Sequence, residues 1–352
     1  MSDQKITYSN PVELRYDSPG KELRTDVIYM PNNPSLLAGK DLRWGIYSSS
    51  GNLPGVIRII DAAAYRRERK GILIGQSSEQ HLAGQVDLAP EGDYIYGGHI
   101  NPHFGHFIIN TLSRYWSVLQ GDFAGKKVIC HGQPGHIERW FSQPHIKEMF
   151  EAIDLHRNDF ITFSRPTKIP RIEIPLPSLI ENYCVHRVYG TLCHWIGDEI
   201  LADFPLNSAS SRPIYLSKLK LKRTYHSAIN EDEICDVLVN EGVEIIYPET
   251  LSVAEQIALW RSRTFIMGIV GSALHTSCFS PAGPKIVGLN LRKGINSNCG
   301  LIDIVNKNNV TYVSPECEAL AQWSGQSQTI ANAFRIKNPK AAAYSLLRAI
   351  EA

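Results

Sequence analysis

The chain has 352 residues, of which 43% are hydrophobic and 20% are charged, and its formal net charge at pH 7 is +1. These proportions are typical of a globular protein, and the small net charge excludes a bulk electrostatic attraction to nucleic acid. No window approaches the roughly 20 apolar residues that span a bilayer, and the first residues lack the apolar core of an export signal. We therefore expect a cytoplasmic protein, with peripheral contact at the inner face of the membrane left open.

The cysteines give a second indication of the compartment. There are seven of them, scattered along the chain, with no CxxC pair. An odd number without motif spacing argues against a disulfide framework and against a zinc site. We therefore expect reduced, mostly buried thiols.

The elements predicted for the first half change character near residue 93. Residues 1–90 are irregular and β-rich, with short apolar runs at 26–30, 55–60 and 71–75 between turns that contain Pro and Gly. From residue 93, strands and helices alternate, and the Asn-Pro pair at 101–102 is a typical helix start. The elements expected here are strands at 93–98, 126–132, 159–165 and 171–177 and helices at 101–119, 144–155 and 185–204.

The second half follows a linker-like stretch, PLNSASSRP at 205–213, which is rich in Ser, Pro and Asn. Beyond it we expect strands at 213–218, 243–249, 264–270, 285–291 and 310–315, helices at 230–242, 252–263, 272–280 and 297–308, and a last helix at 339–352. Continuous apolar strands that alternate with helices predict a parallel sheet covered on both faces.

These patterns predict an α/β fold in three parts. The N-terminal domain is expected at 1–207, with 1–90 β-rich and 91–207 α/β, and the second domain at 208–335. A C-terminal helix at 336–352 completes the chain, and its return to the N-terminal domain is one option. Because parallel sheets bind ligands at the carboxyl ends of their strands, we expect the substrate in a cleft between the two domains.

Several nucleotide-binding and catalytic motifs are absent from the sequence. It contains no GxxxxGK[ST], no GxGxxG after a strand, no HExxH and no GxSxG. No acidic pair stands at a strand end to hold Mg²⁺. His103 and His106 could share a metal ion on one helix face, but no third ligand has motif spacing. We therefore expect no metal site.

Two features of the second half are typical of a phosphate site. Four consecutive residues lead from an apolar strand into a helix: Gly271, Ser272, Ala273 and Leu274. Exposed backbone N–H groups at such a turn favour an anion, although tight packing alone also explains the glycine. Basic side chains follow the first strand of this half, at Lys218, Lys220, Lys222 and Arg223. A loop of this kind suits a diphosphate, and a solvated surface loop is the alternative.

Three stretches, in this order, resemble glycosyltransferase family 61, which includes plant xylan-modifying enzymes, animal protein-modifying enzymes and bacterial capsule-type proteins. The stretches are HFGHFIINTLSRYW at 103–116, YLSK with the following arginine and NEDEI at 215–234, and GVEIIYPETLSVAEQIALWRSRTFIMGIVGSALHTSCFSPAGPKIVGLN at 242–290. The resemblance covers about residues 93–330. It implies a GT-B fold, in which two Rossmann-like domains face each other across a cleft and the C-terminal domain holds a nucleotide-sugar. It also implies inversion at the anomeric carbon and no required metal.

The resemblance also assigns residues. It adds Ser217, Lys218, Arg223 and Glu249 to the small-residue turn as groups that bind the donor. Three positions depart from the family pattern: Lys218 replaces an arginine, Val270 replaces a histidine, and Asn110 replaces a carboxylate. Lysine keeps the charge of arginine but loses its bidentate geometry.

The first stretch carries the expected catalytic base. On a helix that begins at Asn101-Pro102, His103, His106 and Asn110 fall on one face. A helix N-terminus disfavours a charged imidazole, and a neutral imidazole is the form that accepts a proton from a sugar hydroxyl. Together with the resemblance, this favours a catalytic role for His106, with His103 and Asn110 beside it. A histidine packed in the core is the alternative.

The sequence as a whole therefore predicts an inverting glycosyltransferase that moves a sugar from a nucleotide-sugar to a saccharide acceptor. UDP is the first candidate nucleotide, and surface polysaccharide or glycoconjugate synthesis is the expected setting. We expect no cofactor, no metal and no nucleic-acid partner. The alternative is a catalytically lapsed nucleotide- or glycan-binding module of the same fold, which the three departures motivate. No pattern indicates the oligomeric state.

Overall fold

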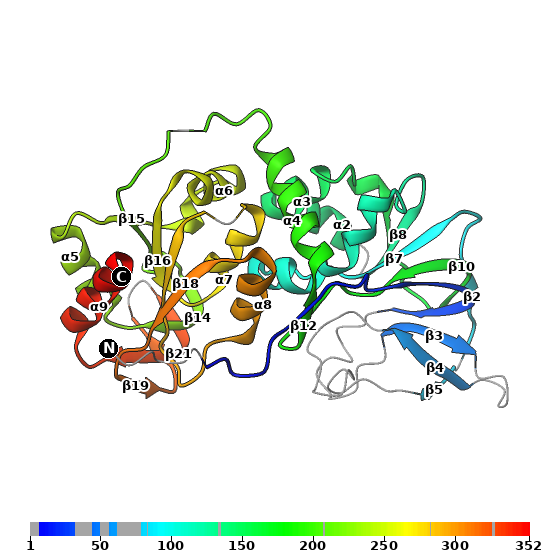
Figure 1. The fold of residues 1–352 in the computed structure, drawn as a ribbon. Helices are drawn as coiled ribbons and strands as arrows, with labels where there is room; N and C mark the ends of the chain where they lie inside the picture. Colours follow the sequence, from blue (N-terminus) through cyan, green and yellow to red (C-terminus); the bar gives the residue numbers. More distant parts are fainter. Residues whose placement is uncertain are drawn as a thin grey trace. The chain divides into compact units, whose positions relative to one another are not determined.

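The structure, a computed structural model, describes residues 7–31, 44–49, 56–61, 79–82, 84–132, 135–206, 208–281, 283–325 and 328–352 (Figure 1). Packing divides the chain into a first unit, Glu13–Leu192, and a second unit, Met1–Val12 with Cys193–Ala352. The domain boundary predicted at residues 207 and 208 stays a prediction, because compact packing does not tell which residues fold on their own. The strand expected at 71–75 lies outside the described residues.

The first unit is built on a mixed sheet. Its strand order is β5 (Glu79–His81), β4 (Val56–Asp61), β3 (Gly45–Ser49), β2 (Lys21–Met30), β10 (Thr167–Pro175), β7 (Tyr94–His99), β8 (Lys127–His131) and β9 (Phe160–Ile161). The strands from β5 to β10 pair in antiparallel, whereas β10, β7, β8 and β9 are parallel. A short strand, β6 (Asp87–Leu88), lies beside β10. A separate sheet has the order β1 (Glu13–Arg15), β12 (Cys184–His186) and β11 (Leu179–Ile180).

The parallel half of this sheet contains a topological switch point. The four parallel strands follow one another along the chain as β7, β8, β9 and β10, but in the sheet their order is β10, β7, β8 and β9. The first strand, β7, therefore lies between the second and the last. From β7 the chain continues to β8, whereas from β10 it continues to β11 of the separate sheet, so the chain leaves these neighbouring strands for different elements. Open α/β sheets bind ligands beyond the carboxyl ends of two strands at which the connections diverge. The segments that follow β7 and β10 therefore hold the usual ligand-binding position of this unit.

The helix predicted at 101–119 forms as one helical run with three kinds of turn. It consists of α-helical α1 (Phe104–His106), π-helical η2 (Phe107–Thr111) and 3-10 η3 (Leu112–Gln120). The predicted start at Asn101-Pro102 is wrong, because His103 is the N-cap residue. The Asn101 side chain accepts the His103 N–H at 2.9 Å, so it stabilises the loop before the helix. The other helices of this half are α2 (His136–Phe141), α3 (Pro144–Glu151), η4 (Arg157–Asp159) and α4 (Arg187–Ile200), and α4 spans the division between the units.

The second unit contains the parallel sheet that the sequence predicts. Its order is β15 (Glu244–Ile246), β13 (Ile214–Leu216), β16 (Phe265–Ile269), β17 (Lys285–Leu289) and β18 (Asn309–Val313), and all four pairings are parallel. In chain order the strands stand 2-1-3-4-5, which is a doubly wound arrangement with its switch point between β13 and β16. A mixed α/β fold is therefore confirmed.

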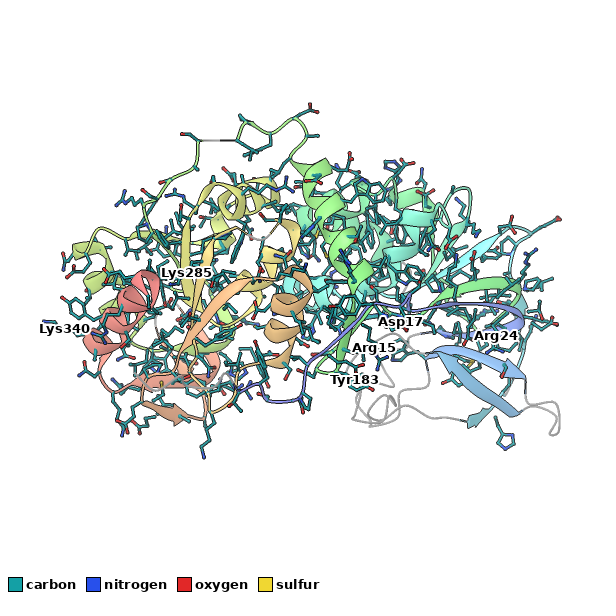
Figure 2. All side chains as sticks on the ribbon, in the orientation of Figure 1. Arg15, Asp17, Arg24, Tyr183, Lys285 and Lys340 are labelled. Carbon is teal, nitrogen blue, oxygen red and sulfur yellow. The ribbon has the colours of Figure 1, made fainter. Side chains whose placement is uncertain are left out.

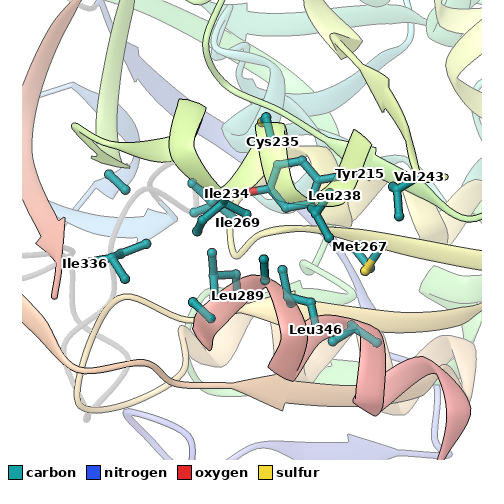
Figure 3. Packing of buried hydrophobic residues seen from close by; sticks show 14 of the residues in the cluster. Tyr215, Ile234, Cys235, Leu238, Val243, Met267, Ile269, Leu289, Ile336 and Leu346 are labelled. Atoms are coloured by element: carbon teal, nitrogen blue, oxygen red, sulfur yellow. The ribbon is translucent and has the colours of Figure 1, made fainter. Parts of the chain in front are cut away.

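The core of this unit explains why the apolar strands are continuous. Tyr215, Met267 and Leu289 of the sheet pack with Leu238 and Leu346 from two helices (Figure 3). All five side chains are fully buried. Truncating a buried leucine of this kind to alanine costs about 2–5 kcal/mol, so the strands and their covering helices stabilise one another.

A second sheet of this unit has no counterpart in the prediction. It contains β14 (Arg223–Ala228), β21 (Thr329–Ile336), β19 (Cys317–Leu320) and β20 (Trp323–Ser324). The basic segment that follows β13 therefore ends in a strand at Arg223, because that strand pairs in parallel with β21, more than 100 residues later. Local patterns cannot reveal a pairing over such a distance.

The predicted helices of the second unit all form. They are α5 (Glu231–Asn240), α6 (Val253–Ser262), α7 (Ser272–His275) continued by η6 (Thr276–Phe279), α8 (Ser297–Asn306) and α9 (Pro339–Glu351). A 3-10 turn, η5 (Pro248–Thr250), was not predicted and replaces the end of the strand expected at 243–249. The option that the last helix returns to the N-terminal domain is wrong. Helix α9 buries Ala343 and Leu346 against α5 and the sheet of its own unit. Lys285, which is labelled in Figure 2, donates from Nζ to the Ile350 carbonyl at 3.1 Å. Among the described residues, no helix combines the length and apolar character that crossing a bilayer requires.

The first described residues of the chain belong to this second unit. Ser9 N donates to Ile295 O at 2.8 Å, and Asn10 N donates to Ser297 Oγ at 2.7 Å. The Tyr8 ring packs against α8 so closely that a Cβ on Gly300 would lie 2.6 Å from it. This segment, residues 7–10, therefore packs a half-buried aromatic side chain against α8 of the second unit.

All seven cysteines are free thiols, as expected. Six of them are buried, and Cys317 is half-buried. Burial raises the pKa of the Cys235 thiol to about 12, with a further contribution from the neighbouring Glu231. Such thiols stay protonated at neutral pH and serve as small apolar side chains.

Candidate active site

The carboxyl ends of β13 and β16 bring two predicted site segments together. Lys218, two residues after β13, extends its side chain to the turn that follows β16. Its Nζ donates to the carbonyl of His226 at 3.0 Å and to that of Val270 at 3.5 Å. The sequence predicted Lys218 and the Gly271 turn as separate features, and the structure places them in contact at the switch point of the sheet.

A buried carboxylate anchors the segment after β13. Glu231, the first residue of α5, is fully buried and accepts the Lys218 backbone N–H at 3.0 Å and the Ser227 hydroxyl at 3.3 Å. Burial raises the pKa of Glu231, while hydrogen bonding and charge from Lys218 oppose the shift. Ser217, also buried, points its hydroxyl to this carboxylate. Ser217 therefore supports the segment from inside, and Glu231 is a contributor that the sequence did not single out.

The Gly271 turn is shaped by the ammonium beside it. Its backbone is extended, with φ 166° and ψ −166°, so conformation alone does not require glycine. A Cβ at this position would lie 2.9 Å from Lys218 Nζ, so the missing side chain makes room for the ammonium. The following helix has only one α-helical turn, and Leu274 uses its N–H to bond Gly271 O at 3.0 Å and buries its side chain. Backbone N–H groups of the turn, rather than a long helix dipole, are what this segment offers an anion.

Further cationic groups gather at the same edge of the sheet. The pKa of His226 is lowered to about 4, first by desolvation and then by the charges of Arg292 and Lys218. Lys218 also bonds the His226 carbonyl, whereas Arg292 acts on the ring through its charge. Arg292 follows β17, and its backbone carbonyl accepts from Asn290 Nδ2 at 2.7 Å. The sequence carried a sign of Arg292, because it directly follows a predicted strand of the parallel sheet.

Two other predicted donor residues lie on different elements. Arg223 is exposed at the start of β14, in the second sheet. Glu249 lies in η5, after β15, where desolvation raises the pKa of its carboxyl and the neighbouring Lys220 opposes the shift. Lys220 Nζ in turn lies 4.0 Å from the centroid of the Tyr247 ring. Among the described residues, the charge of Lys220 acts on Glu249, and neither Glu249 nor Arg223 shares a hydrogen bond or ion pair with the Gly271 turn.

The second candidate location lies in the first unit, at its own switch point. After β7, Asn101 N donates to Thr111 Oγ1 at 3.0 Å, and Thr111 Oγ1 donates to His99 O at 3.2 Å. These bonds fix the loop that presents His103 to the helical run. The His103 and His106 rings are 5.4 Å apart between centroids. Desolvation lowers the pKa of His103, and the neighbouring His106 lowers it further, so a neutral ring is favoured.

His106 lies at the head of a hydrogen-bonded line of side chains. Its Nδ1 is 2.8 Å from Asn110 Oδ1, and Asn110 Nδ2 donates to Glu181 Oε2 at 3.3 Å. Glu181 follows β11, which comes shortly after β10, so the two sides of the switch point supply one line. The predicted grouping of His103, His106 and Asn110 is what the structure shows. Glu181 was missed, because 71 residues separate it from Asn110 and no motif marks it.

The π-helical turn places Asn110 in this line. A π-turn leaves backbone carbonyls without their usual α-helical partners, and π-turns are frequent at functional sites. Here Tyr189 OH donates to Ile108 O at 2.7 Å, and Ser113 Oγ donates to Asn110 O at 2.7 Å. Side chains from outside the backbone ladder thus stabilise a turn that a regular helix would not contain.

The two locations contain no recognisable metal site within the described part of the chain. No group of three or more His, Cys, Asp or Glu side chains there is arranged to hold a metal ion. His103, His106 and the nearby His145 do not form such a group.

The family comparison is decisive. The model of glycosyltransferase family 61 matches residues 104–287, which is more than half of the 352 residues. The chain belongs to glycosyltransferase family 61. The match includes both locations described above, from His106 in the first unit to Lys218 and the Gly271 turn in the second. No curated protein matches the chain significantly.

Membership makes this family 61 protein a glycosyltransferase, with a sugar donor and an acceptor as its substrates. The matched region begins at the first residue of α1 and ends within β17. It therefore contains the line from His106 to Glu181. Arg292 lies just beyond it, on the sheet edge that the match reaches.

Proposed function

We propose that this glycosyltransferase moves a sugar from a nucleotide-sugar, with UDP as the first candidate nucleotide, to a saccharide acceptor with inversion. The observation that carries the proposal is the Lys218 ammonium, which lies against the Gly271 turn at the switch point of a parallel sheet. A cation and backbone N–H groups at this position suit a diphosphate that gains charge as it leaves. Gly271, Ser272 and Ala273 would supply the N–H groups.

In the proposed reaction, His106 is the general base. The acceptor hydroxyl attacks the anomeric carbon and gives its proton to His106 Nε2. The bond from that carbon to the phosphate oxygen breaks, and the nucleoside diphosphate leaves with the electron pair. Attack on the face opposite the leaving group inverts the anomeric centre. One base and a stabilised leaving group are sufficient for this displacement.

We also propose a GT-B arrangement, with the donor on the second unit and the acceptor on the first. No metal and no cofactor are part of the proposal, because Lys218, Arg292 and the turn provide positive charge for the leaving group. The proposed setting is cytoplasmic synthesis of a surface polysaccharide or glycoconjugate.

A lapsed binding module is the second candidate. It is favoured by Lys218, Val270 and Asn110, which depart from the residues that the family pattern places at these positions. Such a module would bind a nucleotide or a glycan without turnover.

Calorimetry and a turnover screen separate the two candidates. UDP, GDP and CMP are titrated into the protein, and the corresponding nucleotide-sugars are then screened for hydrolysis and for transfer to saccharides. We expect one nucleotide to bind and its sugar conjugate to be consumed. Failure of every nucleotide to bind at millimolar concentration would refute the transferase proposal. A nucleotide that binds but whose sugar conjugate is never consumed would favour the module.

A further inference from the structure

In the line from His106 through Asn110 to Glu181, the chemistry of each group determines which one donates and which one accepts each hydrogen bond. Asn110 is 6% exposed and Glu181 is 9% exposed, so water has little access to the bonds between them. A carboxylate only accepts hydrogen bonds, so Asn110 must turn its NH₂ group toward Glu181. The oxygen and nitrogen of an amide can exchange places by a flip of the side chain, and the neighbouring carboxylate of Glu181 selects one of the two arrangements for Asn110.

The order of donor and acceptor continues to the histidine. With its NH₂ group toward Glu181, Asn110 turns its carbonyl oxygen toward His106 Nδ1, at 2.8 Å. A carbonyl oxygen also only accepts, so Nδ1 carries the proton. In the neutral ring, the lone pair then lies on Nε2, and the bond made by one ring nitrogen decides the role of the other.

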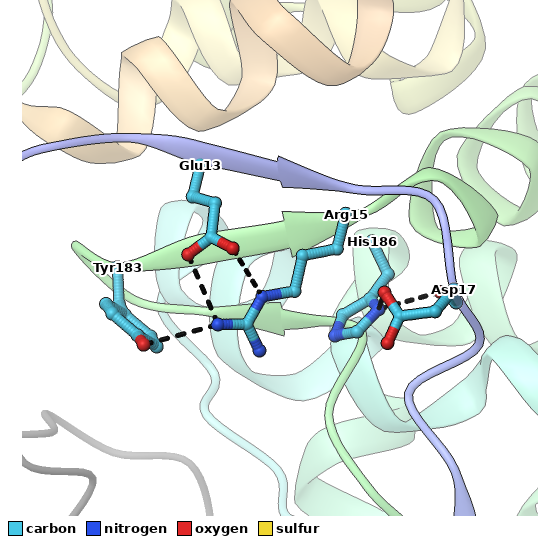
Figure 4. A network of polar contacts seen from close by, with 5 residues as sticks. All are labelled: Glu13, Arg15, Asp17, Tyr183 and His186. Atoms are coloured by element: carbon cyan, nitrogen blue, oxygen red, sulfur yellow. Dashed lines mark hydrogen bonds and ion pairs between the residues drawn. The ribbon is translucent and has the colours of Figure 1, made fainter.

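The hairpin that carries Glu181 is held in place from both sides. Glu181, Asn182 and Tyr183 form the turn between β11 and β12, and Asn182 adopts a left-handed conformation with φ 58°, which asparagine tolerates. Tyr183 OH accepts a bond from Arg15 Nη2 at 3.2 Å, and Arg15 also pairs with Glu13 (Figure 4). Because β1 pairs with β12 as well, the turn has little freedom to withdraw the carboxylate.

We propose that Glu181 is a positioning residue whose carboxylate, acting through Asn110, sets the Nδ1–H tautomer of His106. The part that concerns turnover rests on the proposed function, in which Nε2 is the base. The family pattern places a carboxylate at position 110, beside the histidine. In this chain the carboxylate belongs to Glu181, and Asn110 lies between it and His106. Asn110 has no charge of its own, and its amide, oriented by Glu181, presents a hydrogen-bond acceptor to His106.

The tautomer is measured directly, without substrate. In protein labelled with ¹⁵N-histidine, the ring shifts of His106, assigned with a His106→Ala sample, report which nitrogen carries the proton. We expect the Nδ1–H form in the native protein. Glu181→Gln replaces an acceptor by an amide that also donates, so Asn110 is free to turn and a mixture of tautomers should appear. We expect kcat to fall about 10- to 100-fold, by analogy with the loss when a group that orients a metal-bound histidine is removed.

A swap of the two polar groups provides the rescue. In the double variant Asn110→Asp/Glu181→Gln, a carboxylate at position 110 again offers His106 Nδ1 an acceptor, and the amide at position 181 can donate to that carboxylate. The Nδ1–H form and most of the lost turnover should return. Glu22→Gln is the matched control, because it removes a half-exposed carboxylate that pairs with Arg24 on β2, in the same unit, without touching the line or its hairpin. It should change neither the tautomer nor kcat.

The outcomes distinguish this proposal from the proposed function. An Nε2–H tautomer in the native protein, or an unchanged tautomer in folded Glu181→Gln, overturns the role of Glu181. If that single variant does not fold, Asn110→Leu decides by the same measurement, because it removes the link between Glu181 and His106. An unchanged Nδ1–H tautomer in that variant refutes the same role. A shifted tautomer with unchanged turnover leaves Glu181 in its role and removes His106 as the base, so the proposed mechanism fails instead.

Discussion

Replacing Gly271 by alanine tests the proposed donor site at the place where Lys218 lies closest to the turn. The added Cβ would lie 2.9 Å from Lys218 Nζ, whereas an ordinary contact at such an atom is about 3.4–4 Å. The ammonium must therefore move by about half an ångström or more. Since Nζ is the end of a flexible side chain, the fold should absorb the change with little loss of stability. A displaced ammonium loses a charge-assisted hydrogen bond to the diphosphate, worth about 1.5–3 kcal/mol, so UDP should bind about ten- to hundredfold more weakly.

The assay is calorimetric titration of UDP, with thermal melting as the check on folding. Gly283→Ala is the matched control, because a Cβ there meets its nearest neighbour, the Pro281 carbonyl, at 3.7 Å. Lys218→Met removes the ammonium itself. In that background, Gly271→Ala should have no further effect, since both changes act through one group. UDP binding at native affinity in Gly271→Ala, or an equal loss in the Lys218→Met background, would refute the reasoning.

Three further predictions follow from the other groups described. His106→Ala should lower kcat by about 10²–10⁴-fold and leave UDP affinity unchanged in calorimetry, whereas a folded variant with native kcat would remove His106 from the mechanism. EDTA should leave turnover intact, because cationic side chains take the place of Mg²⁺, and a complete loss that Mn²⁺ restores would contradict this. Burial raises the pKa of Asp303 from 3.8 to about 6, so its contribution to stability is fully present below about pH 4 and is lost as the pH rises through about 6. Asp303→Asn should remove up to about 3 kcal/mol of that pH dependence in melting curves, and an identical dependence in both proteins would count against it.

Features of the fold that depend on residues close together in the sequence were predicted, and features that depend on residues far apart were missed. Strand–helix alternation after residue 213 predicts the parallel sheet, because continuous apolar strands and amphipathic helices are local patterns. The strand from Arg223 was missed because its partner, β21, is far away in the sequence. The start of the first helix was placed too early, because the Asn101 side chain bonds within the loop.

The same distinction holds for the candidate site. His103, His106 and Asn110 lie within eight residues, and helical spacing was sufficient to group them. Glu181 reaches the group only through the fold, from a turn between two short strands. The contact between Lys218 and the Gly271 turn likewise depends on the order of strands β13 and β16, which periodicity does not encode.

The segment of residues 7–10 makes the second unit a product of two pieces of chain. The Tyr8 ring lies against α8, with the Tyr312 ring at 6.4 Å in an edge contact, and Tyr312 OH donates to Asp303 Oδ2 at 2.6 Å. A cut between Val12 and Glu13 would leave this piece attached by noncovalent contacts alone. A fragment that begins at Cys193 would expose the backbone of Gly300 and the Tyr312 edge to solvent. A peptide with the sequence of residues 1–12, added to such a fragment, would return the Tyr8 ring to α8 and cover these groups again.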